Sequence, residues 1–244
     1  DTTGEVQAIT TLTDNSMVIA VMFADTGVAT LASGPGDSFN LRQDIDGQLL
    51  AIADKAIPNH TTQASVTFTL NEEAAAVGAV NVIKRTQMGL VGYNSDVFGF
   101  GESLNKFLQH KDASMINNAL VLGNGGAAKA VLYQLPKMGI LPTLVSRTPT
   151  PDGITYDDLT PDIMNLNRLI IQTTPLGMSP HVDESPNIPY SLLTPRHFLY
   201  DLIYNPEETL FLKQGKARGA KTYNGHEMLV LQAIKSWDIW TSDL

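Results

Sequence analysis

From about position 119 onward, apolar residues form short continuous runs that alternate with amphipathic stretches. The runs predict strands, because a strand buried on both faces shows unbroken apolar sequence; they lie at residues 119–123, 143–146, 169–173 and 198–202. The amphipathic stretches predict helices at residues 127–137, 207–218 and 226–240. Strands that alternate with helices are typical of a parallel sheet covered by helices, so the fold class is α/β.

Two parts of this region are less regular. Residues 148–166 are rich in Pro and Asp, and we expect a loop with a short helix there. In the last helix the 3.6-residue period predicts one stripe, formed by Leu229, Ala233, Ser236, Trp237 and Trp240.

Before residue 119 the pattern predicts mixed elements. Strands are expected at residues 16–23, 64–70, 79–84 and 89–93, with a helix at 47–56. A further helix, at residues 97–108, lies at a boundary near 98–118 that would divide the chain into two α/β domains.

Composition narrows the function classes. The 244 residues are 43% hydrophobic, which allows a sizeable core, and the net charge of −9 without any Lys/Arg cluster argues against nucleic acids and anionic membranes as partners. No cysteine is present, which excludes disulfides, thiolate nucleophiles and Cys-ligated metals, and no metal site is predicted. The longest apolar stretch, residues 17–24, is too short to span a bilayer, and residues 1–12 lack the pattern of a signal peptide. We therefore expect a soluble, cytoplasmic protein.

The strongest local signal is a glycine-rich turn after the strand at 119–123. Its form, Gly123-x-Gly125-x-x-Ala128, fits the dinucleotide fingerprint: the first glycine permits a tight turn, the second lets the backbone approach a pyrophosphate, and the alanine allows close helix packing. The N–H groups of Gly126 and Ala127 would face the phosphates. An ordinary strand-to-helix turn is the alternative, but the flanking strand and helix favour a nucleotide site.

The end of the next strand bears on the choice of cofactor. An NAD site expects an acidic residue about 20 positions beyond the glycine turn, where this chain has Ser146, Arg147 and Thr148. A guanidinium and two hydroxyls suit a 2′-phosphate, so NADP is favoured over NAD. The alternative is a surface arginine in a loop.

Seven motifs in the same order resemble those of the shikimate dehydrogenase family. They cover about residues 74–241 and are Gly78-Ala79-Val80-Asn81, Gly92-Tyr93-Asn94-Ser95-Asp96, the turn at 122–128, Ser146-Arg147-Thr148, Thr173-Thr174-Pro175-Leu176-Gly177-Met178, Tyr200-Asp201 to Pro206 with Thr209, and Gly225-His226-Glu227-Met228-Leu229 with Gln232-Ala233. Gln172 stands where the family usually has Asn.

The resemblance implies a fold and an activity. The fold would have an N-terminal α/β substrate-binding domain at residues 1–100, with the final helix 226–244 packing back on it, and a C-terminal Rossmann-like NADP-binding domain at 101–225. The activity would be the NADP-dependent, reversible reduction of 3-dehydroshikimate to shikimate, a step of aromatic amino acid biosynthesis, by a monomer or homodimer. An NAD-dependent quinate/shikimate dehydrogenase is the enzyme alternative.

The resemblance also implies roles for individual residues. Asp96 would be half of a catalytic Lys–Asp pair, Asn81 and Gln232 would bind the substrate ring, and Tyr204 would line the same cleft. Gly225 and Met228 would flank the nicotinamide, and Thr173 and Thr174 the cofactor ribose. Structural alternatives exist: Asp96 opens a helix, where Asp is a common N-cap, Gln232 could lie at a helix edge, and a buried Asn81 needs some partner.

The first 75 residues depart from the family. Its Ser-x-Ser pair is missing after residues 17–22, and at the N-V-T-x-P-x-K motif this chain retains Thr67, a candidate substrate contact, but has Ser65 for Asn and Asn71 for Lys. The nine residues between Leu70 and Val80 leave no room for the helix that follows in the family. Neither Lys55, in the predicted helix, nor Lys84, expected on the opposite strand face from Asn81, replaces the missing Lys.

Two explanations of this departure remain. The protein could be a degenerate relative, a pseudoenzyme that binds a dinucleotide without turnover. Alternatively, the sequence before residue 72 is incomplete or not authentic. The close resemblance after that point favours the second.

Overall fold

The computed structural model describes the backbone of residues 5–6, 22–23, 28–32, 65–86, 89–109 and 116–242, and the side chains of 70–84, 91–109 and 116–242. Contacts divide the chain into a first unit, Asp1–Ser95 with Lys235–Leu244, and a second unit, Asp96–Ile234. The predicted helix at 47–56 and most of the predicted strand at 16–23 lie outside the described residues, as does Lys55.

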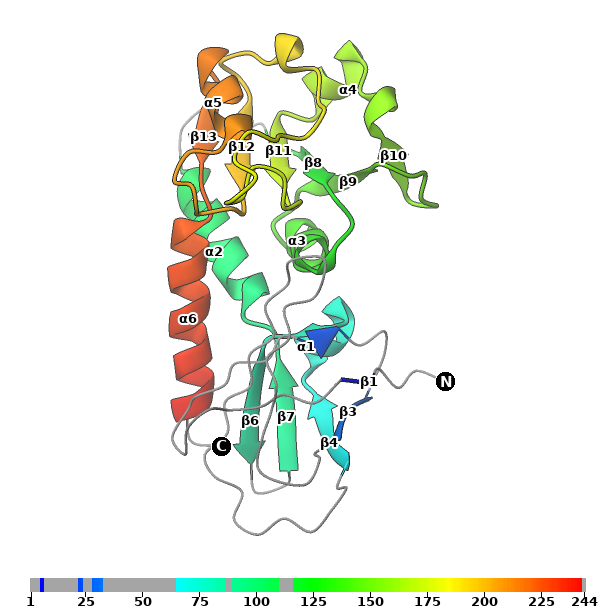
Figure 1. Cartoon of the computed structure of the whole chain (residues 1–244), viewed down its shortest axis with the longest axis vertical. Helices are drawn as coiled ribbons and strands as arrows, with labels where there is room; N and C mark the ends of the chain where they lie inside the picture. Colours follow the sequence, from blue (N-terminus) through cyan, green and yellow to red (C-terminus); the bar gives the residue numbers. More distant parts are fainter. Residues whose placement is uncertain are drawn as a thin grey trace. The chain divides into compact units, whose positions relative to one another are not determined.

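The second unit is built on a parallel sheet of six strands (Figure 1). In sheet order they are β10 (Gly153–Thr155), β9 (Leu141–Ser146), β8 (Asn118–Leu122), β11 (Leu169–Gln172), β12 (Phe198–Asp201) and β13 (Lys221–Tyr223). Counted along the chain, this is the order 3-2-1-4-5-6 of the Rossmann fold. Its switch point lies between β8 and β11, where such sheets bind ligands at their carboxyl ends.

Both faces of this sheet are buried. On β8, Ala119 and Val121 belong to one apolar cluster, whereas Leu120 and Leu122 belong to the other. The first cluster packs under α2 (Asp96–Phe107) and α3 (Gly126–Lys137), and the second under α4 (Pro161–Leu166) and α5 (Leu210–Ala217). Burial on both sides explains the continuous apolar runs from which these strands were predicted.

Side chains and backbone at the helix ends fix where the helices begin. The hydroxyls of Thr160 and Thr209 accept from the N–H groups of Ile163 and Leu212 at the first turns of α4 and α5. α3 differs, because its N-cap is Gly125, which makes no side-chain cap bond. Its first-turn N–H groups therefore receive no bond from the N-cap side chain.

The first unit contains a mixed sheet of five strands (Figure 1). In sheet order they are β1 (Glu5–Val6), β3 (Val28–Ala32), β4 (Ser65–Leu70), β7 (Gly89–Tyr93) and β6 (Val82–Thr86). A separate antiparallel pair joins β2 (Met22–Phe23) to β5 (Ala79–Val80). The predicted strand at 79–84 is therefore wrong as one element: the chain bends at Asn81, whose N–H donates to Tyr93 O at 3.0 Å.

The gap between Leu70 and Val80, judged too short for the helix that follows in the family, does hold a short helix. A six-residue helix, α1 (Glu72–Val77), occupies this gap. Asn71 caps its start, with Oδ1 accepting from the N–H of Ala74 at 2.8 Å, and Gly78 ends it in the left-handed conformation at φ 67°.

The last helix, α6 (His226–Thr241), has its first nine residues in the second unit and the rest in the first. The predicted stripe is not buried along its length, since Trp237 is 59% exposed and Ala233 is exposed. The buried positions are Met228, Ser236 and Ile239. In the first unit, Trp240 Nε1 donates to Ile83 O at 3.0 Å.

The other predicted elements are confirmed within one to three residues at most ends, including α2, α3, α5, β4 and β7. The segment at 148–166 does contain a short helix, but it also contains β10, which was not predicted; β13 was missed as well. Among the described helices, none combines the length and apolar character that a membrane crossing requires.

Candidate functional site

The turn after β8 is shaped by glycine. Gly123 has φ 105°, a conformation that favours glycine. A Cβ atom there would lie 2.7 Å from Thr174 Cγ2 and 2.9 Å from Thr173 Oγ1. The N–H of Gly123 donates to Val145 O at 2.8 Å, and the Thr173 hydroxyl donates to Leu122 O at 2.7 Å. The loops after β8 and β11 therefore meet at the switch point.

The start of α3 suits a diphosphate. Gly125 and Asn124 are exposed, and α3 begins at Gly126 with Ala127 in its first turn. Ala128 is fully buried, which brings the helix close to the sheet. Uncapped N–H groups and the positive end of the helix dipole attract anions. The residues present therefore fit the pyrophosphate of a dinucleotide.

The end of β9 carries the three residues expected to select the cofactor. The buried Ser146 donates its hydroxyl to the carbonyl of Thr148, which closes the turn beneath Arg147. Arg147 and Thr148 are exposed. Burial raises the pKa of Tyr156, and the charge of Arg147 opposes this rise. The guanidinium thus lies within electrostatic reach of Tyr156 and stays open to a ligand from solvent.

Gln172 organises the loop after β11, a role that the sequence analysis missed. Its side chain is fully buried, Oε1 accepts from the N–H and hydroxyl of Thr174 at 3.2 and 3.0 Å, and Nε2 donates to Leu176 O at 3.1 Å. The available signal was a long amide at the end of an apolar run, directly before Thr173, because a buried amide requires partners.

Asp201 organises the loop after β12 and was also missed. It is fully buried, with Oδ1 accepting from the N–H of Ile203 at 3.0 Å and Oδ2 from the hydroxyl of Thr209 at 2.6 Å. Burial raises the pKa of Asp201 to about 7, although both hydrogen bonds act to lower it. The held loop presents Tyr204, which is 49% exposed.

The start of α6 is tied to the same loop. The N–H of Gly225 donates to Ile203 O at 3.0 Å, and a Cβ on Gly225 would lie 1.9 Å from Leu202 O, so only glycine fits. Met228, predicted to flank a nicotinamide, is 7% exposed and belongs to the apolar cluster under α2.

Gln232 of α6 lies against the start of α2 in the second unit. Asp96 is the first residue of α2. One turn further, a Cβ on Gly99 would lie 3.0 Å from Gln232 Cβ and 2.8 Å from Met228 O. α6 thus packs directly on the first turns of α2.

The first unit holds the other predicted substrate residues. Asn81 is 6% exposed, and its Oδ1 accepts from the N–H and hydroxyl of Ser95 at 2.7 and 3.2 Å. Thr67 lies in β4, paired with Thr30, and its side chain is outside the described residues. Lys84 Nζ donates to the carbonyl and hydroxyl of Ser242. Its ammonium is thereby engaged at the end of the chain.

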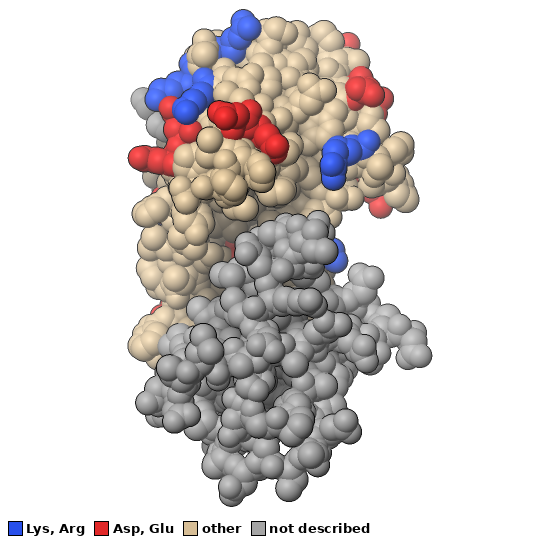
Figure 2. Space-filling model, viewed as in Figure 1, with Lys and Arg blue, Asp and Glu red and all other residues tan. Residues whose placement is uncertain are grey.

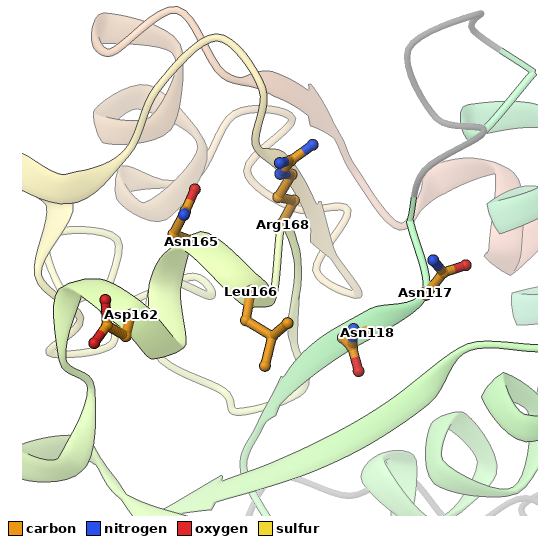
Figure 3. Close-up of a pocket in the computed structure, with 6 residues that line it drawn as sticks. All are labelled: Asn117, Asn118, Asp162, Asn165, Leu166 and Arg168. Carbon is orange, nitrogen blue, oxygen red and sulfur yellow. The ribbon is translucent and has the colours of Figure 1, made fainter.

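A cavity of about 510 Å³ lies at the opposite, amino edge of the six-stranded sheet. Figure 3 shows its lining side chains pointing in different directions around Leu166, with Asn118 at the start of β8 and Arg168 just before β11. It is remote from the glycine turn, which follows the other end of β8. The switch point therefore remains the candidate site.

Charges on the described surface are mixed. On the face shown in Figure 2, acidic and basic side chains are interspersed over the second unit. Within the part of the chain that the structure describes, no group of three or more His, Asp or Glu residues is placed to hold a metal ion.

Comparison with known proteins gives close relatives. No protein-family model matches the sequence. The chain is 33% identical to the shikimate dehydrogenase (NADP(+)) of Desulforamulus reducens over 226 residues, which cover 83% of this chain and 76% of that protein.

Two solved structures share the fold. Shikimate 5-dehydrogenase from Thermus thermophilus, in complex with NADP(H) and shikimate, is 30% identical with a TM-score of 0.60, over 72% of this chain and 67% of that one. Quinate dehydrogenase from Corynebacterium glutamicum, in complex with NAD, is 26% identical with a TM-score of 0.62, over 70% and 66%. The chain thus spans about two thirds of the length of these structures. The identity, the coverage and the Rossmann strand order agree: the chain belongs to the shikimate dehydrogenase family.

Proposed function

We propose that this protein catalyses the NADP-dependent, reversible oxidation of shikimate to 3-dehydroshikimate. One observation carries the proposal: in a member of this family, the glycine turn and the uncapped start of α3 lie at the switch point of the sheet. The relative from Desulforamulus reducens has this activity in its name, and the Thermus thermophilus structure holds both ligands.

The residues after β9 support NADP over NAD. Arg147 is exposed and Ser146 fixes the turn beneath it, so a guanidinium can meet a 2′-phosphate there. The related quinate dehydrogenase holds NAD. An NAD site expects a carboxylate at this place, and this chain has none at residues 146–148.

The chemistry assigned to the chain is proton transfer and orientation. The nicotinamide, when bound, would supply the hydride acceptor for the ring carbon that carries the reacting hydroxyl. Asp96 accepts the proton of that hydroxyl, and a general base of this kind contributes about 10²–10⁴-fold. Thr67, Asn81, Tyr204 and Gln232 bind the ring. Thr173, Thr174, Gly225 and Met228 position the cofactor beside it.

A second candidate function is dinucleotide binding without turnover. It is favoured by two observations: Asn71, at the position of the family's Lys, caps α1, and Lys84 is engaged by Ser242. A developing alkoxide needs a cationic partner, and neither Asn71 nor the engaged Lys84 supplies one. Substrate turnover would then fall to background while the cofactor still binds.

Two measurements on the purified chain, after its intact mass is confirmed, separate these functions. NADPH binding is followed by the cofactor's fluorescence, and shikimate oxidation by NADPH absorbance with NADP⁺ and NAD⁺ in parallel. Turnover that prefers NADP⁺ supports the proposed dehydrogenase. NADPH binding with background turnover supports the second function, and a preference for NAD⁺ and quinate supports a quinate/shikimate dehydrogenase.

Three expectations accompany the proposal. The domain limits of 1–100 with 226–244 and 101–225, the monomeric or dimeric state, and a cytoplasmic location remain predictions. Partial proteolysis and light scattering on the purified protein test the first two.

A further inference from the structure

Gln172 occupies a central place in the candidate site without facing solvent. It ends β11, where its register partners are Leu122 on β8 and Asp201 on β12. Its side chain is 0% exposed. A ligand at the carboxyl edge of the sheet therefore cannot touch this amide directly while the loop in front of it keeps its conformation.

The carboxamide of Gln172 supplies hydrogen bonds to backbone groups of the loop after β11. Its oxygen accepts from the N–H (3.2 Å) and the hydroxyl (3.0 Å) of Thr174, and its nitrogen donates to the carbonyl of Leu176 (3.1 Å). Thr174 Oγ1 in turn accepts from the N–H of Leu176 at 3.4 Å. A buried amide that satisfies both an acceptor and a donor role at three points restricts the loop to one conformation.

This conformation determines how the loop meets the glycine turn. The Thr174 methyl group packs against this turn so closely that a Cβ added to Gly123 would lie only 2.7 Å from it. Thr173 reaches the same turn through its bond to Leu122 O. Any shift of residues 174–176 therefore moves groups that face the proposed cofactor site.

We propose that Gln172 is a positioning residue of the cofactor site, which sets the affinity for the nicotinamide dinucleotide by holding Thr174 against Gly123. The inference rests on the proposed function, because it assumes that these two loops bind the cofactor. It goes beyond that function in assigning the affinity to a side chain that makes no contact with the ligand. An amide is required, since the position needs an acceptor and a donor at once.

The substitution Gln172→Glu tests this requirement, because it keeps the shape and makes the donor depend on pH. A carboxylate accepts from Thr174 but repels the carbonyl of Leu176. A protonated carboxyl group accepts and donates as the amide does. Burial raises the pKa of such a group, so we expect the protonated form at about pH 5.5 and the charged form at about pH 8.5.

The measurement is the NADPH dissociation constant against pH. We expect Gln172→Glu to bind within about threefold of wild type at low pH and at least about tenfold more weakly at high pH, a difference of about 1.4 kcal/mol. Asp201, the register partner on β12, also titrates in this range, so wild type over the same pH series is the reference. KM for the cofactor should follow the dissociation constant, with KM for shikimate little changed.

Gln134→Glu is the matched control. Gln134 is half-buried on α3, against Gly101, and outside the loop after β11; its variant should track wild type at every pH. Thermal unfolding of each variant at both pH values shows that the measured proteins are folded. If Gln172→Glu does not fold at high pH, Gln172→Met, which lacks both polar roles, should show the weakened binding at every pH.

The outcomes are distinguishable. Wild type that binds no nicotinamide dinucleotide overturns the proposed function together with this inference. Wild type that binds NADPH, with a folded Gln172→Glu that matches it across the pH series, overturns the positioning role alone. A loss of affinity that low pH does not restore also overturns it, because the protonated carboxyl group meets the same three partners.

Discussion

The carboxyl edge of the six-stranded sheet and the turns around β4 to β7 use their polar groups differently. At the sheet edge, backbone at Gly123 and Gly125 forms the surface, and the polar side chains of Gln172 and Asp201 are buried behind it, where they hold the loops. Around β4 to β7, Asn71 caps α1 and the Asn81 oxygen accepts from Ser95.

The difference follows from what each ligand requires. A pyrophosphate is bound by backbone N–H groups, so the cofactor region needs glycines at the surface and rigid supports beneath. Proton transfer needs titratable side chains within hydrogen-bond reach of the reacting proton. Lys84, a cation of β6 in the first unit, is bonded to Ser242 and so directed to that end of α6. We therefore expect cofactor binding to be the robust property of this chain, and turnover to be the sensitive one.

The largest expected effect concerns a support of the cofactor region. Because burial raises the pKa of Asp201 to about 7 in the folded state, against 3.8 as its ordinary value, protonation favours folding. The stabilisation from the protonated carboxyl group is fully present below about pH 4 and is lost as the pH rises through about 7. The free energy of unfolding falls by about 4 kcal/mol at most over this range. Asp201→Asn keeps the shape and should remove this pH dependence from the free energy of unfolding, measured by urea titration.

Asp162→Asn is the control for this prediction, since Asp162 is exposed on α4. Its stability should follow that of wild type at every pH. Equal pH dependence in Asp201→Asn and wild type would show that the carboxyl group stays charged in the folded protein, with its two hydrogen bonds outweighing its burial.

The second prediction addresses the catalytic side of the comparison. If Asp96 is the general base, Asp96→Asn should lower shikimate turnover by about 10²-fold or more with NADPH binding unchanged. Glu102→Gln, the same chemical change at an exposed position of α2, should leave turnover unchanged. Unaltered turnover in a folded, active Asp96→Asn would remove Asp96 from the mechanism.

The third prediction sharpens the description of the cofactor surface. Arg147→Ala should weaken NADPH binding by about 1.5–3 kcal/mol, the contribution of a charge-assisted contact, and leave NADH nearly unchanged. Arg196→Ala removes an exposed arginine just before β12, at the amino edge of the sheet, and should affect neither cofactor. Equal losses for NADPH and NADH in Arg147→Ala would contradict a 2′-phosphate contact.

The two regions also differ in how far the sequence predicts them. β8, β11 and β12 were predicted because their apolar runs are buried on both faces. β10 and β13 were missed, since each has three half-buried residues and neither forms an apolar run. Short edge strands are specified by pairing with their neighbours, which a local pattern does not contain.

Around β4 to β7 the sequence held signals that were not used. Asn71 before two acidic residues and Gly78 after Val77 are start and stop signals of a helix, yet the gap was judged by the longer helix of the family. On α6 the stripe includes Trp237, which is exposed, because the helical period shows which residues share a face but not which face is covered. The sequence indicated that a buried Gln172 needs hydrogen-bond partners, but not which ones, since these depend on the loop conformation that places Leu176 within reach.

The smallest expected effect tests whether position 71 serves structure alone. Asn71→Asp retains a capping oxygen and should preserve the free energy of unfolding, whereas Asn71→Ala should lower it by about 1 kcal/mol, the usual contribution of an N-cap. Neither should change NADPH affinity. Asn71→Lys also removes the cap, so its stability should match that of Asn71→Ala. It places an ammonium group where the family has its catalytic Lys. Because α1 starts directly after this position, we expect that ammonium to restore no turnover. A rate of shikimate oxidation above that of Asn71→Ala would show that the missing side chain alone, and not the architecture around β4 to β7, limits turnover.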